Sequence, residues 1–311
     1  MKVLGINISH DASICVYENN KISDFWVEER FNNEKKWYPD NCNEEFNDIF
    51  YLSILKKINF KPDLVCYSSY TKGKRKNSNK KIIESLQKQL DNPKYYFDDK
   101  KHHVYHALCG FYFSKFDEAI SLVIDGGGAH PFLDGFQEFD SIFYVNKKNI
   151  FTIFQHLSNI RYMIRGKNIE NYSDHTFQDF KENTEFLFTS KSNPGFDFNR
   201  MTPAAGFGNE HGKLMGLSSY AYSYENFNLN YNQVKMAKEA QEKSFLKTCK
   251  LIEKCLTYKN IKNIVLSGGY FLNCSNNFKY VKKYPDLNFF VDPIPHDGGT
   301  SIGVCLYNDY K

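Results

Sequence analysis

Apolar and polar positions divide this chain into two series of short strands, each followed by helices. Segments of strand length alternate between apolar and polar residues or are apolar throughout, and polar or glycine-rich turns separate them. Strands are predicted at residues 2–9, 14–17, 22–28 and 64–67 in the first series, and at 120–124, 135–139, 141–146, 263–266 and 288–291 in the second. Helices are predicted near 43–58, near 80–91, over 107–116, near 231–257 and at the C-terminal end. This alternation predicts an α/β protein.

Turns of small residues follow four of the predicted strands. They are His10-Asp11-Ala12-Ser13, Asp125-Gly126-Gly127-Gly128, Ser267-Gly268-Gly269 and Asp297-Gly298-Gly299-Thr300. Glycine lets backbone N–H groups approach phosphate oxygens, and a Gly-Gly pair after a buried strand leaves room for an adenosine. One such turn is typical of ordinary loops, whereas four in this order indicate a nucleotide site. The arrangement resembles actin-like and sugar-kinase-like ATPases, in which two hairpins face each other across a cleft.

His102 and His106 stand at the start of an apolar, aromatic segment that is predicted to form a buried helix. Residues four apart lie on one face of a helix, so both imidazoles can bind one metal ion, while His103 points about 100° away. Imidazole suits zinc, iron, nickel or copper, and two such ligands leave positions for a third group and a substrate. The alternative is a hydrogen-bonded pair of core histidines.

Length and charge limit the class of protein. A chain of 311 residues is long enough for two lobes. Its net charge of +4 is too small to indicate nucleic-acid binding. The basic run at residues 72–76 is interpreted as a solvated loop, with a patch for a nucleic acid or another anionic acceptor as the alternative.

Cysteine spacing and the absence of long apolar runs bear on the compartment. The eight cysteines form no CxxC pair, which excludes a zinc-ribbon or disulfide framework and favours a reducing compartment. The first predicted strand begins at Lys2 without a preceding signal sequence, and no apolar run is long enough to cross a membrane. We therefore expect a cytoplasmic protein without a membrane partner.

Five groups of residues together resemble the O-carbamoyltransferases that modify nodulation factors, cephems and aminoglycosides. The first two groups are Gly5–Ser13 with Glu28-Glu29-Arg30-Phe31 and Lys35, and His102–Ala107 with Phe111-Tyr112 and Ser114. The other three are Asp125–Gly128, Gly212–Leu217 with Tyr220, and Ser267–Gly269 with Leu272, Asn273, Cys274 and Asn277, closed by Asp297–Gly303. The groups follow the family's order over nearly the whole chain.

The resemblance implies a fold and an activity. The fold is an actin-like ATPase fold of two ribonuclease H-like lobes, related to the enzymes that make threonylcarbamoyl-adenosine in tRNA. The first lobe is expected at 1–118 with the HxxxH helix. The second is expected at 119–311 with the phosphate and adenosine loops and a substrate-side insertion at 151–205. The implied activity is the transfer of a carbamoyl group from carbamoyl-adenylate to a hydroxyl of a small-molecule, sugar or nucleoside-type acceptor.

The resemblance also implies a metal ion, usually iron-like, held by a histidine pair and a late aspartate, which match His102, His106 and Asp297. Fe²⁺ is expected, with Zn²⁺ or Mn²⁺ as alternatives, and Mg²⁺ is left open beside ATP or carbamoyl-adenylate. Two histidines and a carboxylate suit such a metal, which can bind phosphate oxygens. A helix N-cap is the alternative role for Asp297. Asp125 either touches the metal through water or only fixes its turn.

His10, beside Asp11, is the candidate general base because imidazole titrates near neutral pH; a turn-stabilising His–Asp pair is the alternative. Lys35 is a candidate for neutralising oxyanion charge, with an ordinary surface lysine as the alternative. The candidate nucleotide-binding residues are Gly126, Gly127 and Gly128 for the phosphates, Glu210 and Lys213 for the ribose, and Gly268, Gly269 and Asn273 for the adenosine. Helix-surface charge and an ordinary helix start are the alternatives for the last two groups.

The sequence departs from the family at its C-terminal end. Family members continue into a domain that makes carbamoyl-adenylate from ATP and carbamoyl phosphate, whereas this sequence ends at Lys311. We therefore expect a separate adenylate-forming subunit, with a different activated donor or inactivity in isolation as alternatives. The competing functions are threonylcarbamoyl-type transfer to a nucleic-acid base or hydroxymethylated nucleotide, a non-catalytic nucleotide-binding scaffold, and a sugar kinase.

Overall fold

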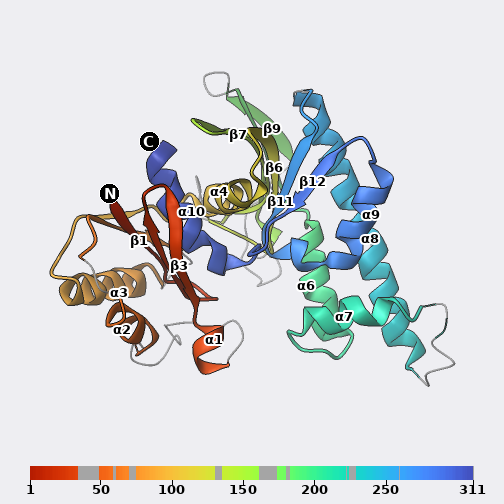
Figure 1. Cartoon of the computed structure of the whole chain (residues 1–311). Helices are drawn as coiled ribbons and strands as arrows, with labels where there is room; N and C mark the ends of the chain where they lie inside the picture. The colour runs from red at the N-terminus through yellow and green to blue at the C-terminus, as the bar shows by residue number, and fades with distance from the viewer. Residues whose placement is uncertain are drawn as a thin grey trace.

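The computed structural model describes residues 1–33, 49–58, 61–69, 75–129, 135–160, 174–179, 183–221, 223, 229–258 and 260–310. Within these residues the chain forms a five-stranded and a seven-stranded β-sheet. Figure 1 shows the first sheet at the red, N-terminal side and the second towards the opposite side, with helices between and around them.

The first sheet has the strand order β3-β2-β1-β4-β5. Its first three strands are antiparallel neighbours, and β1, β4 and β5 are parallel. The strands are β1 (Lys2–Asn7), β2 (Ser13–Glu18), β3 (Lys21–Val27), β4 (Leu64–Ser68) and β5 (Tyr95–Phe97). The helices of this part are α1 (Glu29–Asn32), α2 (Ile49–Leu55) and α3 (Arg75–Gln89). The apolar residues of α2 and α3 pack on one face of the sheet in a single core cluster.

The second sheet has the strand order β12-β11-β6-β7-β8-β10-β9. Its strands are β6 (Glu118–Ile124), β7 (Gln137–Asn146), β8 (Ile150–Ser158), β9 (His175–Asp179), β10 (Thr184–Thr189), β11 (Asn263–Ser267) and β12 (Asn288–Val291). The helices around it are α6 (Pro194–Ala204), α7 (His211–Ser218), α8 (Tyr231–Tyr258), η2 (Gly269–Leu272) and α9 (Cys274–Lys283). Helices α8 and α9 cover one face through a core cluster that includes Ile252 and Tyr280.

The two sheets repeat one topology. In the second sheet, β6, β7 and β8 are antiparallel neighbours, and β6, β11 and β12 are parallel. The order β8-β7-β6-β11-β12 therefore matches β3-β2-β1-β4-β5 strand for strand, with β10 and β9 added at one edge. The first turn, between β1 and β2, and the second turn, between β6 and β7, consequently occupy equivalent positions.

Two helices are exchanged between the sheets. Helix α4 (His102–Ser114) follows β5 of the first sheet but packs against β6, β7 and β11 of the second. Helix α10 (Thr300–Tyr307) follows the short helix η3 (Asp297–Gly299), packs against β1, β2 and β4 of the first sheet, and precedes η4 (Asn308–Tyr310). The two helices also pack on each other between the sheets (Figure 1).

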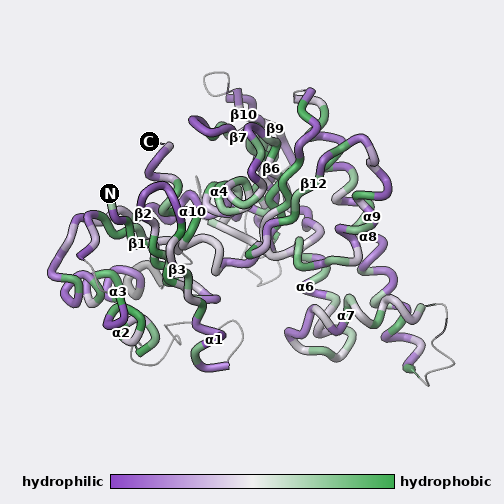
Figure 2. The backbone as a smooth tube through the Cα atoms, in the orientation of Figure 1, coloured by the Kyte–Doolittle hydropathy of each residue, from purple (hydrophilic) through white to green (hydrophobic). Residues whose placement is uncertain are grey.

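Glycines make the crossing of α4 and α10 close. A Cβ at Gly303 of α10 would lie 2.0 Å from the carbonyl oxygen of Tyr105, and a Cβ at Gly5 of β1 would lie 2.0 Å from that of Ser301. Any side chain at these positions would collide with backbone, so β1, α10 and α4 are stacked at the closest packing distance. Figure 2 shows the hydrophobic segments concentrated along the strands and along these central helices.

The structure confirms most of the predicted elements and corrects some boundaries. Helix α8 matches the predicted helix at 231–257. The segments predicted at 135–139 and 141–146 form one long strand, because β7 continues as the central partner of both β6 and β8. The basic run belongs in part to helix α3, which begins at Arg75, so the predicted loop was wrong there. Residues 43–48 lie outside the described residues, and α2 begins at Ile49.

The segment 151–205 contains more sheet than predicted. Its described part holds most of β8, all of β9 and β10, and helix α6. The division between residues 118 and 119 stays a prediction, although the last helix, α10, packs on the first sheet. Among the described residues, no helix is long and apolar enough to span a membrane.

Candidate functional site

The histidines of α4 lie at the junction of the two sheets. His102 is the first residue of α4, and His106 follows one turn later on the same face. Both side chains are fully buried, and their Nε2 atoms are 3.2 Å apart. His103 points elsewhere, with Nδ1 2.8 Å from the hydroxyl of Ser141 on β7. Helix α4 thus places the Nε2 atoms of two buried imidazoles next to each other at the junction of the sheets.

Asp297 reaches this space from the other end of the chain. Its Oδ1 lies 3.5 Å from Nε2 of both His102 and His106. The capping position before η3 belongs to His296, whose Nδ1 accepts the N–H of Gly298 at 3.2 Å, so the carboxylate of Asp297 is not the helix cap. Its carbonyl oxygen accepts the hydroxyl of Thr300 at 2.6 Å, which fixes the residue at the start of α10.

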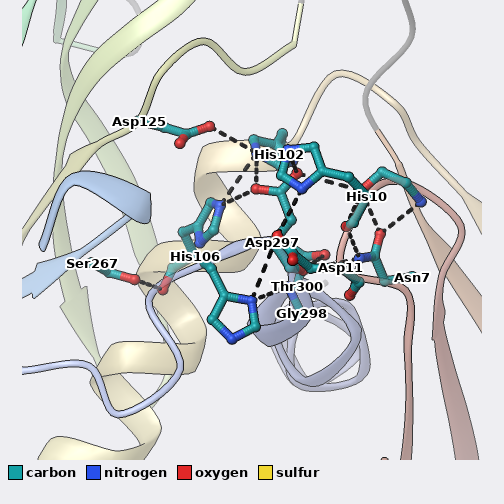
Figure 3. A network of polar contacts seen from close by, with 12 residues as sticks. Asn7, His10, Asp11, His102, His106, Asp125, Ser267, Asp297, Gly298 and Thr300 are labelled. Atoms are coloured by element: carbon teal, nitrogen blue, oxygen red, sulfur yellow. Dashed lines mark hydrogen bonds and ion pairs between the residues drawn. The ribbon is translucent and has the colours of Figure 1, made fainter. Parts of the chain in front are cut away.

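Asp125 completes the cluster from the end of β6. Its Oδ2 lies 3.5 Å from Nε2 of His102. One ligand atom from each of His102, His106, Asp125 and Asp297 lies within 4.8 Å of the others, and all four residues are buried. Figure 3 shows these side chains converging from α4, β6 and the loop before α10.

Buried charges of opposite sign stabilise one another in the cluster. Burial alone would lower the pKa of His102, but the carboxylates of Asp297 and Asp125 raise it to about 10. Burial would raise the pKa of Asp297, but His10 and His102 hold it well below its usual range. The pKa of Asp125 is lowered in the same way, against burial, by its contact with His102. Burial, together with His102, lowers the pKa of His103, which is therefore neutral.

The donor set fits a divalent transition metal. Two imidazole nitrogens on one ion, each about 2.1 Å from it, stand about 3.0–3.4 Å apart for bond angles of about 90–110°. The observed 3.2 Å between the two Nε2 atoms falls in that range. Two imidazoles with one or two carboxylates are ligands that iron, zinc and manganese share. His102, His106 and Asp297 could hold such an ion, with Asp125 at its edge.

The first hairpin turn, between β1 and β2, places a third imidazole against Asp297. His10 Nδ1 lies 2.8 Å from Asp11 Oδ2, and His10 Nε2 lies 3.1 Å from Asp297 Oδ2 (Figure 3). The His–Asp pair therefore forms, and it also faces the cluster. Nδ1 of His10 is therefore oriented by Asp11, and Nε2 is the nitrogen that could accept a proton once its contact with Asp297 opens.

Asn7 holds this turn in place. Its buried Nδ2 lies 3.0 Å from the carbonyl oxygen of His10, 3.1 Å from that of Asp11 and 3.1 Å from that of Asp297. Asp11 has a left-handed backbone with φ 55°, a conformation that aspartate tolerates better than most residues. One amide thus ties the first turn to the loop before α10.

The second hairpin turn, between β6 and β7, begins in its described part with Asp125 and three glycines, Gly126–Gly128. Gly127 has φ 143°, and a Cβ at Gly128 would lie 2.7 Å from Nε2 of His103, so a glycine is required there. Gly268 has φ 93° and lies against the carbonyl oxygen of Ile124, while a Cβ at Gly269 would lie 3.1 Å from Oδ1 of Asp125. The structure therefore brings the Gly-Gly pair after β11 to the turn that carries Asp125.

A second asparagine holds this turn. Nδ2 of Asn193 lies 2.8 Å from each of three oxygens: the carbonyls of Asp125 and Phe139 and Oδ1 of Asp140. His156 in turn holds Asp140, with Nδ1 2.8 Å from its Oδ2. The described part of 151–205 therefore borders the second turn through Asn193.

The structure gives the surroundings of Asn273, Glu210 and Lys213, whose predicted roles stay predictions. The side chain of Asn273 is used internally: it exchanges two hydrogen bonds with Gln241 and accepts the N–H of Asn276, so it caps α9. Glu210 and Lys213 stand at the start of α7, whose Met215 sulfur lies 3.9 Å from that of Cys274. They therefore lie on the helix beside the Gly268–Asn273 loop. Lys35 lies outside the described residues.

Sequence reasoning missed four supporting residues: Asn7, Glu138, Asn193 and His296. Glu138 of β7 is buried and accepts the N–H of Ala129 at 3.2 Å and the amide of Gln155 at 2.6 Å. Burial raises its pKa to about 7, although the positive His102 and the N–H groups of Ala129 and His103 act to lower it. Asn7 lies inside the group Gly5–Ser13 but was given no role there, because the importance of such residues depends on contacts between segments far apart in the sequence.

Comparison with known proteins defines the fold. Full-length HypF, in its phosphate- and nucleotide-bound form, superposes with a TM-score of 0.60 at 13% identity, covering 99% of this chain and 55% of HypF. The activator of 2-hydroxyisocaproyl-CoA dehydratase from Clostridium difficile, with bound ADPNP, gives 0.51 at 11% identity, covering 99% and 94%. The ROK hexokinase of Thermus thermophilus gives 0.53 at 9% identity, covering 98% and 97%. The chain has the actin-like ATPase fold.

Sequence comparison reaches one distant relative. The uncharacterized protein MJ1051 of Methanocaldococcus jannaschii is 28% identical over 326 residues, which cover 98% of this chain and 56% of the relative. The chain thus spans about half the length of the curated relative it matches. No protein-family model matches the sequence.

Proposed function

We propose that this chain transfers a carbamoyl group from carbamoyl-adenylate to the hydroxyl of a small acceptor. The adenylate lies along the second turn, the acceptor lies beside His10, and a divalent transition metal lies between His102, His106 and Asp297. The observation that carries the proposal is the position of the cluster. It has the His10–Asp11 pair on one side and the glycine-rich turn that follows Asp125 on the other.

The nucleotide side of the proposal rests on the backbone of the second turn. Its glycines carry no side chains, so phosphate oxygens could approach the backbone of the turn closely, and Gly268 and Gly269 would let an adenosine approach the end of β6. Two structures with the same fold carry nucleotides, namely HypF and the Clostridium difficile activator. Glu210 and Lys213 on the neighbouring α7 are the candidates for the ribose.

The transfer step balances with the residues present. The acceptor oxygen attacks the carbamoyl carbon, forming a new C–O bond. The bond from that carbon to the phosphate oxygen breaks, and AMP leaves with the electron pair. The hydroxyl proton passes to Nε2 of His10, which exchanges its contact with Asp297 Oδ2 for the acceptor hydroxyl, while Asp11 on Nδ1 stabilises the imidazolium that forms. Asn7 holds the His10 turn at a fixed distance from Asp297 during this step.

The metal has a defined part in this proposal. When bound, it supplies positive charge against the phosphate oxygens of the leaving AMP. Iron(II) is the proposed ion, and zinc or manganese would suit the same donors. The adenylate itself is proposed to come from another domain or subunit that activates carbamoyl phosphate with ATP. Lys35 remains a candidate for neutralising oxyanion charge.

Metal content is the first test. Elemental analysis of the purified chain should find about one transition-metal ion per chain. His102→Ala/His106→Ala should lose it, and His103→Gln, an equally buried neighbour that faces Ser141, should keep it. Loss of metal from all the folded variants alike, or no metal in the wild type, would contradict the metal site.

Turnover of supplied carbamoyl-adenylate is the second test, because it does not depend on the source of the adenylate. AMP release with hydroxyl compounds present should exceed that of the blank and fall by at least about 100-fold in His10→Gln. Metal content should not change in that variant. Tight adenylate binding without AMP release in the metal-loaded chain would instead indicate a nucleotide-binding scaffold.

A further inference from the structure

A hollow of about 470 Å³ opens beside the first turn, on the side of the cluster away from the glycines. Three elements of the first part of the chain line it, β3, α1 and α2, together with the loop before η3. The lining residues are Phe25, Trp26, Val27, Glu29, Arg30, Phe31, Phe50, Ile54, Lys57, Pro293, Ile294 and His296. Its volume lies in the range of about 300–1,000 Å³ that small-molecule sites occupy.

The lining combines aromatic faces with charged groups. The rings of Phe31 and Phe50 meet edge to face with centroids 5.9 Å apart, and Trp26 stands partly buried against the core of the first sheet. Arg30 and Lys57 provide N–H hydrogen-bond donors, and the carboxylate of Glu29 provides a hydrogen-bond acceptor. Aromatic faces pack on the C–H faces of rings, and charged groups bond hydroxyls, so this lining suits a hydroxylated ring such as a sugar or nucleoside.

His296 connects the hollow to the candidate site. It lines the hollow, and its Nδ1 accepts the N–H of Gly298 at 3.2 Å and lies 3.8 Å from Oδ2 of Asp11. Since Nδ1 is an acceptor, the neutral ring carries its proton on Nε2. Asp11 is the partner of His10, so a ligand against His296 lies one residue away from the His–Asp pair.

The end of β3 fixes this closeness. Val27, a lining residue, pairs with Ser13 at the end of the first turn, and the N–H of Glu28 donates to the carbonyl of Ala12 at 2.9 Å. The wall of the hollow is therefore hydrogen-bonded directly to the turn that carries His10. The hollow cannot shift relative to that turn without breaking these bonds.

We propose that this hollow is the acceptor pocket and that the acceptor is a small hydroxylated ring compound with an apolar face. This inference rests on the proposed function, since it supplies the hydroxyl side of the same reaction. It places the acceptor on the first sheet, opposite the nucleotide on the second. The two substrates then meet at Asp297, whose carboxylate contacts His10 on one side and His102 and His106 on the other.

The test uses Trp26 as a reporter. The chain has two tryptophans, so Trp37→Phe leaves Trp26 as the only one. Titration of this full chain with adenosine, cytidine, glucose and glucosamine should change the fluorescence of Trp26 with at least one probe. Phe31→Ala and Arg30→Ala in the same background should weaken that binding at least tenfold. Phe278→Ala, which removes an exposed ring from α9, should not. No response to any probe, or equal weakening by Phe278→Ala, would overturn the pocket.

A second measurement separates this inference from the proposed function. Metal content and acceptor-free hydrolysis of carbamoyl-adenylate report on the cluster, and transfer to the bound probe reports on the pocket. Phe31→Ala should raise the KM for the probe while both cluster readouts stay unchanged. If the wild type holds no metal and releases no AMP, the proposed function fails, yet the fluorescence titration still decides whether the hollow binds a hydroxylated ring. If Phe31→Ala lowers metal content and hydrolysis together, its role is structural and the pocket is overturned.

Discussion

The two hairpin turns occupy equivalent positions in a repeated topology, but they are built in opposite ways. The first turn carries His10 and Asp11, whose side chains form its chemistry, and the described start of the second is the glycine run Gly126–Gly128. Each is held by one buried asparagine whose amide nitrogen meets three oxygens. The same topology thus presents candidate functional groups as side chains in the first turn and as bare backbone in the second. What the two halves share is a buried asparagine that holds the turn.

Breaking the contact between the halves should have the largest effect. Gly303→Val would place a Cβ within 2.0 Å of the backbone of Tyr105, where no rotamer can relieve the collision. We expect a loss of at least about 3 kcal/mol, enough to leave little folded protein. Gly216→Ala on α7, where a Cβ meets nothing within 4 Å, should be neutral or stabilise by up to about 1 kcal/mol. Thermal unfolding checks both, and equal melting temperatures would contradict the close crossing.

Removing the residue that both halves share should be the next largest effect. Asp297→Asn keeps the shape but removes the charge that faces His10, His102 and His106. Metal affinity should fall by more than the roughly 10–100-fold that loss of a supporting residue outside the ligand set costs. Competition with a chromophoric chelator measures it. Unchanged affinity would remove Asp297 from the ligand set.

The asparagine pair allows the two halves to be tested separately. Asn7→Ala and Asn193→Ala should each destabilise the chain by about 2–3 kcal/mol, because each removes a buried amide that contacts three oxygens. Denaturant unfolding measures this loss. Under the proposed function, Asn7→Ala should mainly lower kcat through His10, and Asn193→Ala should mainly raise the KM for the adenylate. The same kinetic change in both variants would mean that the turns are not specialised.

Glu138 provides the smallest and most specific effect, a dependence on pH. Burial raises its pKa from 4.5 to about 7, so between these values the native state keeps a proton that the unfolded state loses. Stability should therefore fall by roughly 2 kcal/mol as the pH rises from about 5 to about 8. In Glu138→Gln this fall should be smaller by that amount. Urea unfolding of the metal-free chain at several pH values measures it, and parallel profiles would contradict the assignment.

The sequence predicts the local parts of this molecule better than the distant ones. Helix α8 and the strands that begin each half follow from their apolar patterns, and the spacing of His102 and His106 places both on one face of a helix. The pairing of His10 with Asp297 joins opposite ends of the chain, and no local pattern encodes it.

Residues that support the site were out of reach for a related reason. Asn193 is an ordinary polar residue in sequence, and its importance comes from the carbonyl oxygens of a turn far away in the chain. Asn273 was expected beside the adenosine because of its motif, but its partners Gln241 and Asn276 engage its side chain inside the protein. Propensity and spacing specify elements, whereas tertiary contacts decide which side chains remain available to a ligand.

The exchange of α4 and α10 between the sheets has a consequence for how the chain folds as it is synthesised. The first sheet receives its central covering helix, α10, from residues far along the chain, and Asn7 meets Asp297 across 290 residues of sequence. The strands β1, β2 and β4 must therefore wait, with one apolar face uncovered, until the residues of α10 have been synthesised. Such non-local closure is slow and exposes intermediates to aggregation, so the protein is a candidate for chaperone dependence during translation.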